Sequence, residues 1–206
     1  MPPDGDVTRM RLVGGNLGLD FVNTRSGPPT GDPDDDVLIE YRDLVAWADY
    51  AGAISADEGQ RLLARAKSDR SAAAATLAHA RRVRDDLDDV LRAIANGGKV
   101  YERALERLRD DESDALRHAQ FEPGTAFTWQ WHGDHSPARP LWPVVHAAVD
   151  LLLSDSLDRI KQCRGCSFLF LDESKNRSRR WCSMDDCGTD EKMRRYVDAR
   201  RAARQR

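Results

Sequence analysis

All four cysteines of this 206-residue chain lie in one short stretch, between Cys163 and Cys187. Their spacing is Cys163-x2-Cys166-x15-Cys182-x4-Cys187, which gives two close pairs separated by a segment long enough for a hairpin. Two such pairs can hold a tetrahedral zinc ion, because each pair binds the metal from a tight turn. Four sulfur ligands leave no open coordination position, so we expect one structural Zn²⁺ and no catalytic metal.

Two other interpretations of the cysteines stay open at this point. Unrelated reduced thiols are usually buried and scattered along a sequence, unlike these two pairs. An iron–sulfur cluster also takes four thiolates. Zinc is favoured because a unit this small buries too little apolar surface to fold alone, and a structural metal supplies folding energy.

The surroundings of the cysteines predict how they are positioned. Residues 167–171 predict a strand, a polar turn follows, and residues 178–181 predict the return strand of a hairpin. A helix is expected to begin near Thr189 or Asp190. The order of knuckle, hairpin, knuckle and helix predicts a self-contained, treble-clef-like zinc module.

The residues before the cysteines predict a mainly helical body. Apolar residues recur at helical spacing in five segments, near 41–51, 55–66, 71–96, 101–117 and 140–153. Ser55 and Glu58 form a capping box, and Gly97 and Gly98 end the longest segment. Residues 126–132 alternate like a strand, for which residues 10–13 or the segment after them are the natural partner, whereas 17–24 fit either a strand or a short buried helix.

These elements together predict an α+β fold that is mainly α. We expect a helical N-terminal domain with a small antiparallel sheet over residues 1–158. A treble-clef-like zinc finger with a basic C-terminal helix should follow over residues 159–206.

Composition and charge limit the classes of function. The chain is 40% apolar and 33% charged, and it contains no apolar run near the roughly 20 residues that span a bilayer. Its start lacks the basic and apolar segments of a signal peptide, so we expect a cytoplasmic protein without a membrane partner, in which thiols stay reduced. The net charge is −3, but residues 161–206 carry +6 and residues 1–160 carry −9.

The basic end of the chain is a candidate nucleic-acid surface. Its cations could neutralise several phosphates; the candidates are Lys175, Arg177, Arg179, Arg180, Lys192, Arg194 and Arg195. The alternative is a solvated basic helix, or a tail that docks on the acidic body of the same molecule. No residue can be assigned to reading bases.

The sequence gives little support for an enzyme. Asp20, Asn23 and Thr24 are polar residues among apolar neighbours, which is compatible with a small-molecule pocket or, more simply, with hydrogen bonding of a buried turn. The chain has no nucleophile elbow, and its Gly14-Gly15-Asn-Leu-Gly18 stretch lacks the lysine of a phosphate-binding loop. We therefore expect binding rather than catalysis.

Two segments resemble a known protein family. The cysteine region, with Cys163-Arg-Gly-Cys166, Phe170-Leu-Asp-Glu-Ser-Lys-Asn176 and Arg179-Arg-Trp-Cys-Ser-Met184, resembles the CGNR-type zinc finger. Leu19-Asp-Phe-Val-Asn-Thr24 resembles the opening motif of the ABATE domain, described as a "putative stress-induced transcription regulator". The resemblance implies a bacterial zinc protein of regulatory, DNA-binding role.

The sequence departs from the family at its namesake motif. Cys-Gly-Asn-Arg reads Cys187-Gly188-Thr189-Asp190, so an aspartate that repels phosphate replaces an arginine that could face one. The leading hypothesis is a zinc-binding transcriptional regulator whose finger binds DNA, while the body senses an unknown small-molecule effector or forms a homodimer. The alternative is a structural zinc module that binds protein without nucleic acid.

Overall fold

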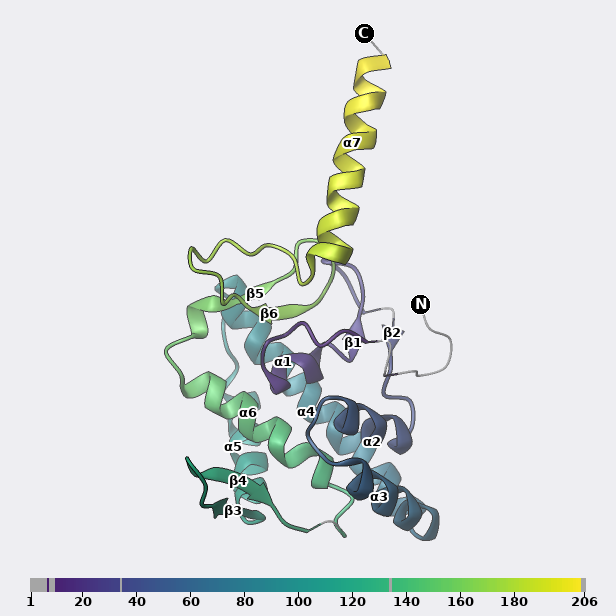
Figure 1. The fold of residues 1–206 in the computed structure, drawn as a ribbon, viewed down its shortest axis with the longest axis vertical. Helices are drawn as coiled ribbons and strands as arrows, with labels where there is room; N and C mark the ends of the chain where they lie inside the picture. The colour runs from purple at the N-terminus through teal and green to yellow at the C-terminus, as the bar shows by residue number, and fades with distance from the viewer. Residues whose placement is uncertain (1–6, 8–9, 34, 134, 205–206) are drawn as a thin grey trace.

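The computed structural model describes residues 7, 10–33, 35–133 and 135–204. Within these residues the chain forms seven α-helices and three antiparallel two-stranded sheets, which confirms a mainly helical α+β fold. Helices α1 to α6 gather in one body, and the last helix, α7, projects from one end of it (Figure 1). None of the helices described is both long and apolar enough to cross a membrane.

The long helix α4 (Arg70–Asn96) is the centre of the body. The side chain of Asp69 caps its start by accepting the N–H of Ala72, and Gly97 ends it in the left-handed conformation at a φ of 65°. Val83, Leu87 and Leu91 recur every four residues along it and are completely buried. The predicted apolar stripe is therefore the face against which the other elements pack.

Three of the longer helices pack against α4, namely α2 (Tyr41–Tyr50), α3 (Ala56–Ser68) and α5 (Glu102–Leu116), while α6 (Trp142–Leu153) packs against α5. The predicted capping box is present at the start of α3, where Ser55 and Glu58 satisfy each other's backbone N–H groups. Short 3₁₀ turns at Arg139–Leu141 and Leu157–Arg159 precede α6 and the finger.

The segment that could be a strand or a helix is the short helix α1 (Leu17–Val22). Asn16 caps it by accepting the N–H of Gly18, which favours the helical choice. A Cβ atom at Gly18 would lie 2.5 Å from the Cβ of Ala148, so only glycine lets α1 approach α6 this closely.

The predicted partner of the alternating strand is wrong. Strand β4 (Thr128–Trp131) pairs with β3 (Ala119–Glu122), and residues 10–13 take no part in this sheet. A local hairpin closes a much shorter loop than pairing with the N-terminus would, which costs less chain entropy. The Phe121 ring stacks on the Trp129 ring at a centroid distance of 4.1 Å, which strengthens the pairing.

A short ladder joins the two ends of the segment between α1 and α2. Strand β1 (Arg25–Ser26) pairs with β2 (Asp35–Asp36). The buried guanidinium of Arg84 on α4 donates to both carboxylate oxygens of Asp36, at 2.7 and 2.5 Å. A bidentate ion pair at a buried arginine holds the ends of this loop in place.

The predicted hairpin of the finger is also wrong. Strand β6 (Leu169–Leu171) pairs with β5 (Ile160–Gln162), which lies before the first cysteine, and residues 178–181 form no strand. The other edge of β6 is occupied by the N-terminal segment. The N–H of Leu171 donates to the carbonyl of Gly14 at 2.7 Å, and Asn23 bonds both backbone groups of Leu169.

The finger is consequently not self-contained. Ile160 and Leu169 belong to the same apolar core as the body helices. A smaller core surrounds Cys163, Phe170 and Cys182. The chain then makes a π-helical turn, η4 (Met184–Gly188), and enters α7 (Thr189–Arg204), which begins where the sequence predicts.

Candidate metal centre

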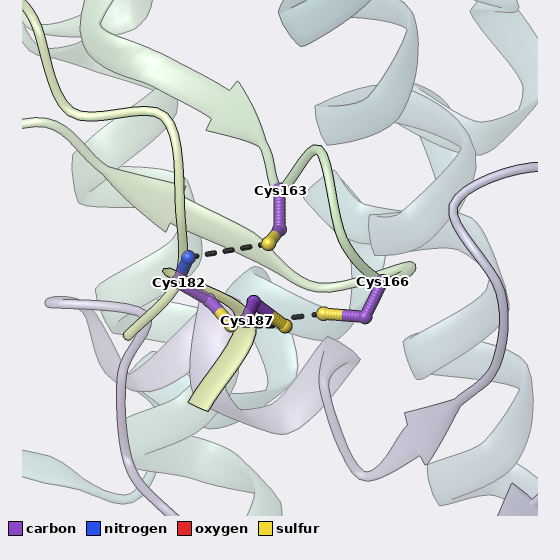
Figure 2. Close-up of side chains that lie close together, drawn as sticks. All are labelled: Cys163, Cys166, Cys182 and Cys187. Carbon is purple, nitrogen blue, oxygen red and sulfur yellow. Dashed lines mark hydrogen bonds between the residues drawn. The ribbon is translucent and has the colours of Figure 1, made fainter. Parts of the chain in front are cut away.

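The four cysteines converge from two segments that are separated by 15 residues (Figure 2). Cys163 and Cys166 lie in the turn between β5 and β6, while Cys182 precedes the π-helical turn and Cys187 lies within it. All four sulfur atoms lie within 4.8 Å of one another. The fold therefore brings together the whole ligand set that the spacing predicts.

The sulfur positions match a tetrahedral metal site. Cys166 Sγ lies 3.6 Å from Cys182 Sγ, which in turn lies 3.7 Å from Cys187 Sγ. Zinc–sulfur bonds of about 2.3 Å in a tetrahedron place neighbouring sulfurs about 3.8 Å apart. The four cysteines thus fit one structural zinc ion with no position left for substrate.

Backbone groups orient the ligands and set how closely the two segments approach. The N–H groups of Gly165 and Cys182 donate to Cys163 Sγ at 3.4 and 3.3 Å. Such bonds stabilise negative charge on a metal-binding sulfur. A Cβ atom at Gly165 would lie 2.9 Å from the Cβ of Cys187, so the first knuckle needs glycine at this position.

The crowding of sulfurs makes four simultaneous thiolates unfavourable without a cation. Hydrogen bonds from Cys166 and Cys182, with help from the backbone N–H groups, lower the pKa of the Cys163 thiol. The neighbouring Cys163 sulfur and burial raise the pKa of the Cys166 thiol to about 12. A divalent cation removes this conflict because it stabilises all four thiolates together.

Asp172 organises the loop behind the cysteines, a role that the sequence analysis missed. Its completely buried carboxylate accepts bonds from Lys161 Nζ at 2.5 Å and from the backbone N–H groups of Ser174 and Arg179. Burial acts to raise its pKa, but these donors outweigh burial and hold the pKa well below its usual range. The bond to the N–H of Ser174, two residues later, is an Asx turn, which an aspartate at the start of a polar turn could have indicated.

Arg179, a predicted nucleic-acid contact, forms part of the finger's own structure. Its guanidinium donates to the carbonyls of Val13, Leu171, Trp181 and Cys182, and it lies 4.3 Å from the centre of the Phe170 ring. Most of its N–H donors are therefore already used. Residues 178–181 form no return strand, so these bonds from Arg179 hold this segment against the rest of the finger.

The polar residues of the opening motif connect the body to the finger. Asn23 donates to the Leu169 carbonyl and accepts the Leu169 N–H, both at 2.9 Å, as a neighbouring strand would. Asp20 accepts the N–H of Gly14 at 2.7 Å, and burial raises the pKa of this carboxyl to about 6. Thr24 bonds the Phe21 carbonyl and the guanidinium of Arg84.

Hydrogen bonds within the protein account for the polar side chains of the opening motif, and no ligand is needed to explain them. All three side chains are buried and have protein partners. None of them lines the cavities at the end of α4, between α3 and Pro137, along α2 to α4, or beside Arg11 and Tyr50. Their geometry favours the structural alternative that the sequence left open.

A second connection, which the sequence analysis also missed, joins residue 11 to the turn before α7. The Arg11 guanidinium donates to Ser183 Oγ at 2.9 Å and to the Asp186 carboxylate at 2.5 Å. Both charged partners are about half exposed, so the pair contributes little to stability by itself. It nevertheless fixes the acidic turn against the N-terminal segment.

The remaining predicted nucleic-acid contacts lie on two exposed elements. Lys175, Arg177 and Arg180 are on the loop after β6, where Arg177 pairs with Asp158. Lys192, Arg194 and Arg195 are on α7, which stands clear of the body (Figure 1). Glu191 pairs with both Arg194 and Arg195, so their charge is partly balanced within the helix.

Comparison with protein families agrees with this architecture. The model of the ABATE family, a "putative stress-induced transcription regulator", matches residues 15–155. The model of the CGNR zinc finger matches residues 159–201 and includes all four cysteines. Comparison with curated proteins gives no match. The chain therefore belongs to the ABATE family and carries a CGNR zinc finger with a four-cysteine centre suited to one structural zinc ion.

Proposed function

We propose that this protein is a zinc-dependent transcription regulator that binds duplex DNA through its finger and α7. The observation that carries the proposal is the position of α7, whose side chains are exposed over almost its whole length beside the metal centre. A free basic helix next to a zinc module is a typical nucleic-acid footprint.

The exposed cations suit contacts with the phosphate backbone. Lys192 has no ion-pair partner in the described part of the chain, and the arginines that pair with Glu191 are about 70% exposed. Exposed pairs of this kind are weak, so a phosphate can replace the carboxylate. Because the basic residues occupy several sides of α7, we assign them to phosphate contacts and assign no base reading.

In this proposal Cys163, Cys166, Cys182 and Cys187 are the four zinc ligands. Two of them flank or lie within the π-helical turn that leads into α7. A zinc ion bound to these cysteines would hold the turn in place and so fix the direction in which α7 leaves the body. The metal would thus act on DNA binding through structure, and we assign the protein no catalytic activity.

The body would supply ligand sensing or dimerisation. An open, largely apolar groove of about 700 Å³ runs between α2, α3 and α4, past Ile39, Leu63 and Leu77. Grooves of this size and character accept small organic molecules. We therefore place a candidate effector there rather than at Asp20, Asn23 and Thr24, and we expect such a protein to act in the cytoplasm, where its thiols stay reduced.

DNA binding can be tested by fluorescence anisotropy with labelled genomic fragments. The zinc-loaded protein should bind, and the logarithm of the affinity should fall linearly with the logarithm of salt concentration. Pull-down of genomic DNA with the wild type, beside the Cys182→Ser variant, then identifies sites that depend on the metal centre. Absence of binding at low salt by the zinc-loaded protein contradicts the proposal.

A protein-binding module is the second candidate function. Met193, Tyr196 and Val197 lie at helical spacing on one side of α7 and are 56%, 57% and 40% exposed. Apolar residues gathered on a free helix favour a protein partner, such as a second copy of the chain. Sedimentation of the wild type and of a Met193→Ser/Val197→Ser variant distinguishes the two: a dimer that only the wild type forms, without affinity for DNA, supports this candidate.

A further inference from the structure

A basic depression of about 350 Å³ lies where the end of α4 meets the finger. Its walls come from α4, β5, the first knuckle and residues 177–180. No described carboxylate lines it, and five of its lining residues are cationic: Lys161, Arg164, Arg177, Arg179 and Arg180. A hollow with this lining attracts anions.

Two of the five cations are balanced by nearby carboxylates outside the depression. Lys161 pairs with the buried carboxylate of Asp172, and Arg177 pairs with Asp158. These two residues therefore shape the wall and add little net charge to it.

The other three cations have no carboxylate partner among the residues that the structure describes. Arg179 donates only to carbonyl groups, which satisfy its hydrogen bonds and leave its positive charge in place. The side chains of Arg164 and Arg180 have no partner among the residues that the structure describes. The N–H of Arg164 donates to the Arg180 carbonyl at 3.2 Å, so the two free guanidinium groups come from adjacent backbone.

The frame around these arginines is held by hydrogen bonds. Asn96 at the end of α4 donates to Gln162 Oε1 at 3.0 Å, and Gln162 donates to the Pro29 carbonyl at 2.7 Å. Arg177 takes a left-handed φ of 51°, which is unfavourable for a residue with a side chain, and its carbonyl accepts a bond from Lys161. Backbone held in this conformation beside a cavity is a common feature of ligand sites.

We propose that this depression binds a small phosphate monoester between the body and the finger. Three guanidinium groups without a carboxylate partner offer more N–H donors than one singly charged DNA phosphodiester can use, and they suit the three terminal oxygens of a monoester dianion. Guanidinium groups also recognise phosphate oxygens through paired N–H donors, as the free side chains of Arg164 and Arg180 can. The site lies apart from α7, but Arg177, Arg179 and Arg180 belong to the finger, so its test includes competition with duplex DNA.

The test is calorimetric titration of the zinc-loaded full-length chain at pH 8. Phenyl phosphate serves as the dianionic probe, dimethyl phosphate as the singly charged diester, and a short duplex as the DNA probe. Phenyl phosphate should bind saturably and at least about tenfold more tightly than dimethyl phosphate. Arg164→Ala and Arg180→Ala should each weaken it by about tenfold, the usual effect of losing a hydrogen bond to a charged group.

Two controls separate this site from general charge effects and from DNA binding. Lys175→Ala removes a cation from the same loop but outside the depression, and it should leave phenyl phosphate affinity unchanged. The Lys192→Ala/Arg194→Ala/Arg195→Ala variant should also bind phenyl phosphate normally, whatever its effect on DNA. Melting temperatures equal to the wild type show that the variants are folded.

Two results would overturn the proposal. One is no saturable binding of phenyl phosphate, or equal affinity for the diester. The other is displacement of phenyl phosphate by duplex DNA together with a loss of DNA affinity in Arg164→Ala and Arg180→Ala, which would make the depression a contact for the DNA backbone.

Discussion

The metal-binding part of the finger and helix α7 adjoin each other and are both basic, but they use their charges differently. Between residues 160 and 188, Lys161 bonds a buried carboxylate and Arg179 bonds four carbonyl groups. Along α7, the described basic side chains from Lys192 to Arg201 are exposed, and the contacts that they make are with acidic or aromatic residues of the same helix.

Basic residues that lie close together in the sequence therefore need not share a role. Arg179 and Arg180 are neighbours, yet the first holds the finger together and the second has no side-chain partner among the described residues. A prediction based only on the number of cations would assign both arginines to nucleic-acid contacts. The following substitutions separate residues that maintain the fold from residues that are free to bind.

Loss of the metal should have the largest effect. Structural zinc sites contribute apparent binding free energies of about 10 kcal/mol or more, so chelation or Cys182→Ser should unfold the finger. Zinc content and thermal unfolding by circular dichroism measure this, with Met184→Ala, an exposed neighbour, as the control. A Cys182→Ser protein with wild-type zinc content and melting temperature would show that the four cysteines do not act as one site.

Substitution of Asp172 by asparagine should cost about 3 kcal/mol in the free energy of unfolding, because it leaves Lys161 without its buried partner. The folded pKa of Asp172 lies below the unfolded value, so its stabilising effect is present above about pH 4 and is lost as the pH falls further. Denaturant unfolding at pH 7 and at low pH measures both. Glu173→Gln at the exposed neighbour should change stability by less than about 0.5 kcal/mol; equal losses would refute the role of Asp172.

Asp20 should give the opposite pH dependence. Its folded pKa of about 6 lies above the unfolded value of 3.8, so stability is greatest below about pH 4 and declines as the pH rises through 6. The Asp20→Asn variant can still accept the Gly14 N–H, and it should lack this decline in the free energy of unfolding, which is about 3 kcal/mol for a pKa shift of this size. Unfolding curves between pH 4 and 7 test this, with the exposed Asp49→Asn as a control that should retain the wild-type slope.

Asn23→Ala should weaken the junction between body and finger by about 2 kcal/mol, because it leaves both backbone groups of Leu169 without partners. Hydrogen exchange at the Leu169 amide should accelerate with it. The exposed Asn176→Ala is the matched control. Unchanged exchange at Leu169 would mean that the junction does not depend on this side chain.

The α7 variant Lys192→Ala/Arg194→Ala/Arg195→Ala should change stability least, by under about 0.5 kcal/mol, because its side chains are exposed. Under the proposed function it should nevertheless weaken DNA binding and reduce the salt slope by about 3. Anisotropy and thermal unfolding measure the two effects separately. A stability loss as large as that of Asn23→Ala would show that these cations help to maintain the fold, as Lys161 and Arg179 do in the metal-binding part.

The features that depend on local sequence were predictable. Ligand spacing, helix periodicity and capping act within a few residues, so the four cysteines, α4 and the capping box of α3 were identified correctly. The domain boundary at residue 158 stays a prediction, although Ile160 and Leu169 beyond it belong to the main core.

The partners of the strands were not predictable in the same way. Strand β6 could pair with residues on either side of it in sequence, and the fold gives one edge to β5 and the other to Gly14 and Asn23. Nothing local to residues 167–171 marks that choice, since it follows from how α1 packs on the body. The role of Arg179 could not be predicted for the same reason. One of its carbonyl partners is Val13, which is distant in sequence and reaches the finger only through the tertiary fold.

The bonds between Asn23 and Leu169 also set the order in which the protein can be completed during synthesis. The two residues are 146 positions apart, and Arg11 is 175 positions from Asp186. A chain leaves the ribosome from its N-terminus, so the opening motif emerges long before the strand that satisfies it. Helices α2 to α6 can pack first, but the region around α1 reaches its final state only when the last cysteines have emerged and bound their metal.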